Sequence, residues 1–116
     1  MMRVALTLVV FAVLLPVRGH GQASPVRFAS AQMLENDRVR VQRVTVPVGY
    51  RDPVSVLQND VVVVQVSPGE MEVAIGQNRT SGHVDAGKTW YVPKAMPHQF
   101  SNVGNAPYET IIVFLK

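Results

Sequence analysis

The sequence predicts an all-β domain, a single barrel or sandwich, preceded by an N-terminal signal-peptide helix. Three observations support this fold class. Short segments are rich in β-branched residues and tend to alternate between apolar and polar side chains, whereas no segment has a convincing helical period. Turn residues separate these segments at short intervals, as in sandwiches and barrels. The 116 residues of the chain are enough for one domain only.

The first 23 residues have the pattern of a cleaved signal peptide. A positive start at Met1-Met2-Arg3 leads into an almost unbroken apolar run from Val4 to Pro16, and small residues then stand at Gly21 and Ala23. The run is too short for a membrane-spanning helix, which needs roughly 20 residues. We therefore expect cleavage after Ala23, a secreted or periplasmic protein, and no membrane span after cleavage.

The expected mature domain, residues 24–116, is nearly neutral and has no cysteine. The whole chain carries a formal charge of +3, but without Arg3 and Arg18 nine Lys or Arg stand against eight Asp or Glu, which leaves +1. No basic stripe is present, so we expect no nucleic-acid partner. No disulfide can form, and stability must come from the apolar core.

Several segments of the mature domain have the character of strands. The alternation slips between Val41 and Val44, which predicts a bulge or a change of sheet there. The turn 67–70 predicts a hairpin between two of the segments, 61–66 and 71–75, and the polar residues 76–87 predict a loop. The expected strands cover residues 38–46, 61–66, 71–75, 89–92, 98–103 and 108–115.

Segments 61–66 and 111–115 are apolar on both faces. A strand with one wet face should alternate, so both faces of these two strands are expected to be covered. One face fills the barrel. The other packs either against the chain's own opposing sheet or against a second subunit, and the sequence leaves a homodimer as one of these two explanations.

Residues 87–102 closely resemble the second sequence motif of the cupin family. That motif has Gly, five residues, Pro, one residue, Gly, two residues, His, three residues and Asn. Four of its five fixed positions are matched here, by Gly87, Pro93, His98 and Asn102, and the exception is Ala95 in place of Gly. The resemblance implies a single-domain jelly-roll barrel in which His98 points into the mouth.

The first cupin motif is matched only in its spacing. When it is anchored at Gly49 and Gly69, its two histidine positions fall on Ser55 and Leu57, and its glutamate position falls on Val62. Residues 55 and 57 share a strand face and should still point inward. They bring a hydroxyl group and a hydrocarbon in place of two imidazoles.

A metal site of the cupin kind is therefore not expected. Such a site would use three histidines and one carboxylate, and the mature domain contains only His83 and His98. Leu57 and Val62 have no lone pair to donate to iron, manganese, zinc or nickel. The sequence indicates no metal ligands and no cofactor.

The candidate ligand-binding residues are His98, Tyr91, Ser55 and Phe100. The parity of Tyr91 with Pro93, and of Phe100 with His98, predicts that both aromatic side chains point inward. Such a cup could hold a small molecule by stacking and one or two hydrogen bonds. His98 could equally be a histidine that hydrogen-bonds a neighbour, and the aromatic residues could be core.

No catalytic residue is predicted, because no serine lies in a nucleophile elbow and no cysteine is available. The favoured interpretation is an exported, non-catalytic, cupin-like domain that binds a small ligand or a partner. One alternative is a metal-dependent isomerase or oxygenase with an unusual ligand shell around His98. The other is a structural dimerisation module whose cup is packed shut.

Overall fold

The structure is a computed structural model that describes residues 27–116. The predicted signal peptide and its cleavage point lie outside the described residues. The described part contains no helix, and therefore no helix that could cross a membrane. It is built from eight strands: β1 Ala29–Glu35, β2 Val39–Val46, β3 Asp60–Gln65, β4 Gly69–Ile75, β5 Asn78–Val84, β6 Thr89–Val92, β7 His98–Asn102 and β8 Tyr108–Leu115.

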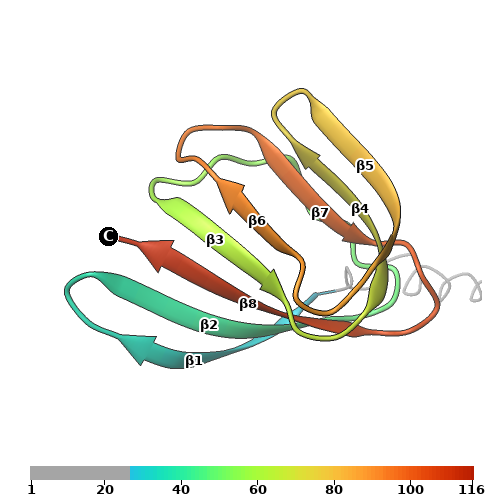
Figure 1. Ribbon diagram of the computed structural model, residues 1–116, viewed down its shortest axis with the longest axis horizontal. Coiled ribbons are helices and arrows are strands. Elements are labelled where there is room, and N and C mark those ends of the chain that lie inside the picture. The colour runs from blue at the N-terminus through green and yellow to red at the C-terminus, as the bar shows by residue number, and fades with distance from the viewer. Residues whose placement is uncertain (1–26) are drawn as a thin grey trace, which may run out of the picture.

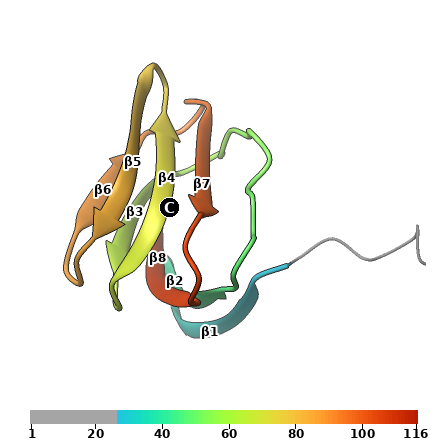
Figure 2. The same ribbon diagram turned by 90° about the vertical axis from the view of Figure 1, so that its right-hand side faces the viewer.

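The strands form two antiparallel sheets that face each other (Figure 1; Figure 2). The larger sheet has the order β1-β2-β8-β3-β6, and the smaller has the order β5-β4-β7. Side chains alternate between the two faces of each strand, so one set from each sheet fills the interior. The all-β jelly-roll fold expected from the sequence is confirmed.

The core lies between the inner faces of the two sheets. The larger sheet contributes Val44 and Val46 of β2, Val61 and Val63 of β3, Val92 of β6 and Tyr108 of β8, and the smaller contributes Met71 and Val73 of β4. Trp90 and Phe100 bridge the sheets edge to face, with ring centroids 5.4 Å apart. Burial of these apolar side chains is the main term that stabilises the domain.

Two sequence-based expectations about local pairing are wrong. Segments 61–66 and 71–75 do not form a hairpin: β3 pairs with β6 and β8, whereas β4 pairs with β5 and β7. The turn between them is instead the corner at which the chain passes from one sheet to the other. Residues 76–87 are not simply a loop, because β5 occupies most of them. β5 is an edge strand with exposed side chains, and its polar sequence therefore resembles that of a loop.

The bulge or change of sheet predicted between Val41 and Val44 is also absent. β2 pairs with β8 without interruption from Val39 to Val46, and the register shift lies in the neighbouring β1, between Gln32 and Leu34. The apparent slip has another cause. Val39 and Val41 lie on the outer face of the sheet, whereas Val44 and Val46 lie on the inner face.

Candidate functional site

Ser55 and Leu57, at the two histidine positions of the first motif, lie in a segment that runs beside β7. Ser55 and His98 exchange two backbone hydrogen bonds, in which Ser55 N donates to His98 O at 3.2 Å and His98 N donates to Ser55 O at 2.9 Å. Tyr50 and Asp52 make further backbone bonds to the same strand. The segment from Tyr50 to Leu57 thus extends the smaller sheet as an irregular fourth strand.

A cavity of 230 Å³ lies between this segment, β7 and the inner face of the larger sheet. We call it the cup. Its wall is mostly apolar, with a few polar groups on its lining, as in small-molecule sites. The polar side chains that line it are Gln42, Tyr50, Asp52, Ser55, His98, Tyr108 and Thr110.

His98 is the most unusual residue of the cup. Its side chain is only 8% exposed, and its Nδ1 atom is buried with no hydrogen-bond partner among the described residues. A buried polar atom without a partner costs about 1–3 kcal/mol. The ring packs edge to face near Phe100, at a centroid distance of 6.2 Å. The site therefore keeps a free hydrogen-bonding atom at a position where an apolar residue would be more stable.

A second polar group in the cup is formed by Tyr50, Asp52 and Tyr108. The Tyr50 hydroxyl donates to Asp52 Oδ1 at 2.7 Å, and the Phe100 amide donates to Asp52 Oδ2 at 3.1 Å. Burial, followed by the hydrogen bond to Asp52, raises the pKa of Tyr50. Burial, followed by the negative charge of Asp52, raises the pKa of Tyr108. Both phenols therefore stay neutral at physiological pH and retain their donor hydrogens.

The structure brings three of the four predicted ligand-binding residues together. His98, Ser55 and Phe100 all line the cup, with Ser55 exposed at its entrance. Tyr91 does not line the cup, and its predicted inward orientation is wrong. It is 54% exposed and lies opposite Val62, on the outer face of the larger sheet. The parity argument failed because Pro93 lies beyond the end of β6, where strict alternation no longer holds.

The position assigned to the glutamate of the first motif also needs correction. Val62 points outward, in register with Val113 on one side and Tyr91 on the other. Its neighbour Val61 points inward and lines the cup together with Leu57. The first motif allows three or four residues between its second histidine position, here Leu57, and its glutamate position. A spacing of three places the glutamate position on Val61, which points inward.

The donor set of the cup does not fit a cupin-type metal. The motif positions supply one imidazole, from His98, and one hydroxyl group, from Ser55, beside Leu57 and Val61. The two oxygens of Asp52 already accept internal hydrogen bonds. Within residues 27–116 no cluster of three metal-ligating side chains is present. A metal that prefers three imidazoles and a carboxylate would find too few donors here.

The fixed positions of the two motifs have structural roles in this chain. Ala95 has a φ of +65°, so it adopts the left-handed conformation that glycine tolerates best. Asn102 Nδ2 donates to Val46 O at 3.2 Å and to Ala106 O at 3.0 Å, which anchors the turn before β8. A Cβ on Gly69 would lie 2.8 Å from the Tyr108 ring, so glycine lets this ring pack against the corner.

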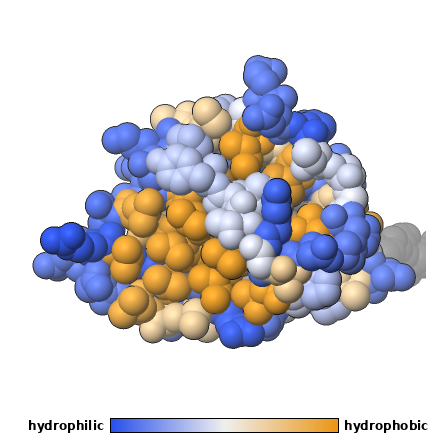
Figure 3. Space-filling model, in the orientation of Figure 1, coloured by the Kyte–Doolittle hydropathy of each residue, from blue (hydrophilic) through white to orange (hydrophobic). Residues whose placement is uncertain are grey.

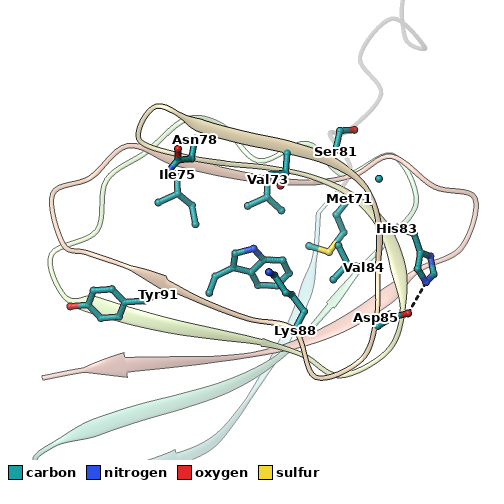
Figure 4. Close-up of a pocket in the computed structure, with 13 residues that line it drawn as sticks. Met71, Val73, Ile75, Asn78, Ser81, His83, Val84, Asp85, Lys88 and Tyr91 are labelled. Carbon is teal, nitrogen blue, oxygen red and sulfur yellow. Dashed lines mark hydrogen bonds and ion pairs between the residues drawn. The ribbon is translucent and has the colours of Figure 1, made fainter.

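A second, open hollow of 720 Å³ lies between β4, β5 and β6. Figure 4 shows Met71, Val73 and Ile75 of β4 pointing into it, whereas the ring of Tyr91 lies at one end and is directed away. His83 closes the opposite end through hydrogen bonds to Glu70 at 2.7 Å and to Asp85 at 3.0 Å. The Lys88 ammonium lies 5.9 Å from the Trp90 ring centroid. This hollow is wide and its polar groups are largely exposed or already paired.

Comparisons with known proteins agree on the fold. No protein-family model matches the sequence, and no curated protein matches it. Among solved structures, a cupin domain from Bordetella pertussis Tohama I has a TM-score of 0.67 at 17% identity and covers 81% of this chain and 98% of its own. An RmlC-like cupin family protein with a double-stranded β-helix fold, from Methanocaldococcus jannaschii, has a TM-score of 0.64 at 17% identity, with 78% and 81% of the chains covered.

The DMSP lyase DddQ from Ruegeria pomeroyi DSS-3 has a TM-score of 0.68 at 17% identity, and the match covers 78% of this chain and 47% of the lyase. The chain therefore has the cupin jelly-roll fold, which its second motif had suggested. At these identities the likeness concerns the fold alone. The same fold carries a lyase in one neighbour, so the activity of this chain must be argued from its own cup.

Sequence reasoning missed the Tyr50–Asp52–Tyr108 group. Tyr108 is far in the chain from Tyr50 and Asp52, and only the packing of the segment 50–57 beside β7 and opposite the larger sheet brings the three to the same cavity. One signal was present: Asp52 and Tyr50 lie within the poorly matched first motif, at positions that the motif does not specify.

Proposed function

We propose that this protein is an exported, non-catalytic cupin-fold domain that binds a small, uncharged and mostly apolar molecule in the cup, without a metal. The observation that carries the proposal is the buried, unpartnered Nδ1 of His98 at the wall of the cavity. A ligand with one hydrogen-bonding group would satisfy this atom. The apolar run from Val4 to Pro16 supports export, and the mass of the purified protein should then correspond to a chain that begins at Ser24.

The dimensions of the cup limit the ligand. An engineered apolar cavity of about 150 Å³ holds benzene, so 230 Å³ suits a substituted single ring or a branched molecule of similar size. The polar side chains add hydrogen-bonding groups, and none of them is a lysine or an arginine. A phenol-sized molecule with one hydroxyl group matches this combination of size and chemistry.

Phenol and toluene form a matched pair of probes for this proposal. They have nearly the same shape, and only phenol can hydrogen-bond to His98 Nδ1. We expect both to bind, with phenol the tighter. His98→Leu should weaken phenol binding about 2–10-fold, the value of one net hydrogen bond, and should leave toluene unchanged. NMR titration of both proteins measures all four affinities.

Two results would overturn the proposal. One is a native protein that binds neither probe, and the other is a His98→Leu variant that binds phenol as tightly as the native protein does. The melting temperature of His98→Leu is the control for folding. It should be unchanged or higher than that of the native protein, because the variant removes a buried atom that has no hydrogen-bond partner. An equivalent of metal in the native protein, lost in His98→Leu, would instead support the metal-dependent enzyme.

A further inference from the structure

The two sheets are not joined to each other on the side of β5 and β6. Each of these strands is at the edge of its sheet, because β5 pairs only with β4 and β6 pairs only with β3. The open hollow of 720 Å³ lies at this gap, and its volume is within the range of about 300–1,000 Å³ that small-molecule sites have. Trp90 lines the hollow and Phe100 lines the cup, so this packed aromatic pair separates the two cavities.

The inward positions of β5 differ from those of a core strand. Directly paired residues of neighbouring strands lie on the same face, so Asn78 and Thr80 share a face with their partners Ile75 and Val73. Figure 4 shows Ile75 and Val73 pointing into the hollow. A strand whose inner face packs against a core carries apolar residues there. β5 instead brings an amide and a hydroxyl group to the hollow, and both residues are exposed.

Gly82, on the same face of β5, leaves the backbone of the strand accessible from the hollow. Its φ is +135°, a conformation that residues with a side chain rarely adopt. A Cβ at this position would have no atom within 4 Å, so no packing contact of residues 27–116 requires a glycine. β5 pairs with β4 without a register shift, so the glycine does not mark a bulge. A glycine inside a strand otherwise marks a place where a ligand comes close to the backbone.

Trp90 and the charged side chains complete the lining of the hollow. Trp90 is partly buried and lies opposite Val63, on the inner face of the larger sheet. The Lys88 ammonium is 5.9 Å from its ring centroid, the outer limit of a cation–π contact, so this flexible side chain can turn to a ligand. Lys88 and Asp85 have opposite charges, and His83 is hydrogen-bonded to Asp85. The lining therefore favours a neutral ligand.

We propose that the hollow is a second binding site, separate from the cup, for a neutral oligosaccharide. A pyranose ring with equatorial hydroxyl groups shows only C–H groups on its two faces, and such a face packs against an aromatic ring such as Trp90. Its hydroxyl groups donate and accept hydrogen bonds, as do the amide of Asn78 and the hydroxyl of Thr80. Because the hollow is open, a chain of sugar units can continue past the residues that bind it.

The test uses the fluorescence of Trp90, which is the only tryptophan of the chain and therefore reports on the hollow directly. The probe is cellotriose, a neutral trisaccharide whose ring hydroxyl groups are all equatorial. We expect cellotriose to change the Trp90 emission saturably at millimolar concentrations. Its affinity should be the same with and without toluene, because toluene enters the cup and cellotriose does not.

Two threonine variants locate the bound cellotriose. Thr80→Val keeps the shape of the side chain and removes its hydroxyl group, so it should weaken cellotriose binding about 2–10-fold, the value of one net hydrogen bond. Thr89→Val is the matched control, because Thr89 is an exposed threonine of β6 that lies opposite Val64, on the outer face of the larger sheet. This variant should bind cellotriose as the native protein does. Circular dichroism checks that both variants are folded.

Four results would overturn the proposal. The first is a native protein whose Trp90 emission does not respond to cellotriose. The second is an equal affinity of Thr80→Val and Thr89→Val for this probe. The third is competition between toluene and cellotriose, which would place the sugar in the cup. The fourth is tighter binding of the acidic trisaccharide trigalacturonate than of cellotriose, which would make the hollow an anion site centred on Lys88.

Discussion

The two faces of β3 both carry valines but have different surroundings. On the inner face, Val61 and Val63 of β3 are 1% and 6% exposed and pack in the core. On the outer face, Val62 and Val64 of the same strand are half-buried, and nothing in residues 27–116 packs over them. Four consecutive valines thus divide into two residues that hold the domain together and two that lie on the outer face.

This difference teaches that an apolar residue in a strand does not by itself belong to the core. The inner face is only partly apolar: it includes Gln42, Tyr108 and Thr110, which line the cup. The outer face has a more uniformly apolar centre (Figure 3), formed by Val41, Val62, Val64, Ile111 and Val113, although no described residue packs over it. In this molecule the covered face, rather than the uncovered one, carries the polar groups that line a cavity.

The largest expected effect compares Val63→Asp with Val64→Asp. Val63→Asp places a carboxylate in the core, where an unpaired buried charge costs several kcal/mol, a large part of a total stability of about 5–15 kcal/mol. Val64→Asp places the same group on the outer face, where it reaches solvent in the monomer. Chemical denaturation at low protein concentration should show severe destabilisation for Val63→Asp only. Equal losses for the two variants would mean that both faces of β3 are buried within one chain.

The second effect concerns a designed metal site, which distinguishes inward from outward positions. Ser55→His, Leu57→His and Val61→Glu together should join His98 in a shell of three imidazoles and one carboxylate, which suits zinc or nickel. Zinc should then raise the melting temperature as the site fills, because only the folded state has the site. The control replaces Val61→Glu by Val62→Glu, which points outward and should give a smaller shift. If the two triple variants respond equally to zinc, the inward position is not residue 61.

The smallest effect concerns His83, an exposed histidine outside the cup. Hydrogen bonds to Glu70 and then to Asp85 raise the pKa of His83 above its usual value near 6.5. A raised pKa in the folded state stabilises the fold fully below pH 6.5, and this contribution is lost as the pH rises through the raised value. The melting temperature of His83→Asn should therefore fall below that of the native protein at pH 5 and approach it at pH 9. The same difference at both pH values would contradict the assignment.

Several features followed from local sequence alone. Residues 61–66 and 108–115 were predicted as strands, because runs of β-branched residues between turn signals favour the extended backbone. The fixed spacing from Gly87 to Asn102 indicated the fold, because Gly, Pro and Asn there meet conformational requirements that few other residues satisfy. The sequence also showed that the first motif has few metal ligands. Leu57 has no lone pair to donate, and neither has Val61 or Val62, the two residues that the motif's two spacings assign to its glutamate position.

Other features were decided only by the tertiary structure. The sequence could not tell that residues 67–70 form a corner between sheets, because a corner and a hairpin use the same turn residues, and only long-range pairing distinguishes them. It could not assign Tyr91 or Val62 to a face, because parity is reliable only within one unbroken strand. The cup and the apolar outer face of the larger sheet arise from the registers of strands distant in the chain. The order of residues set which side chains were available, and the pairing of the sheets determined which of them met.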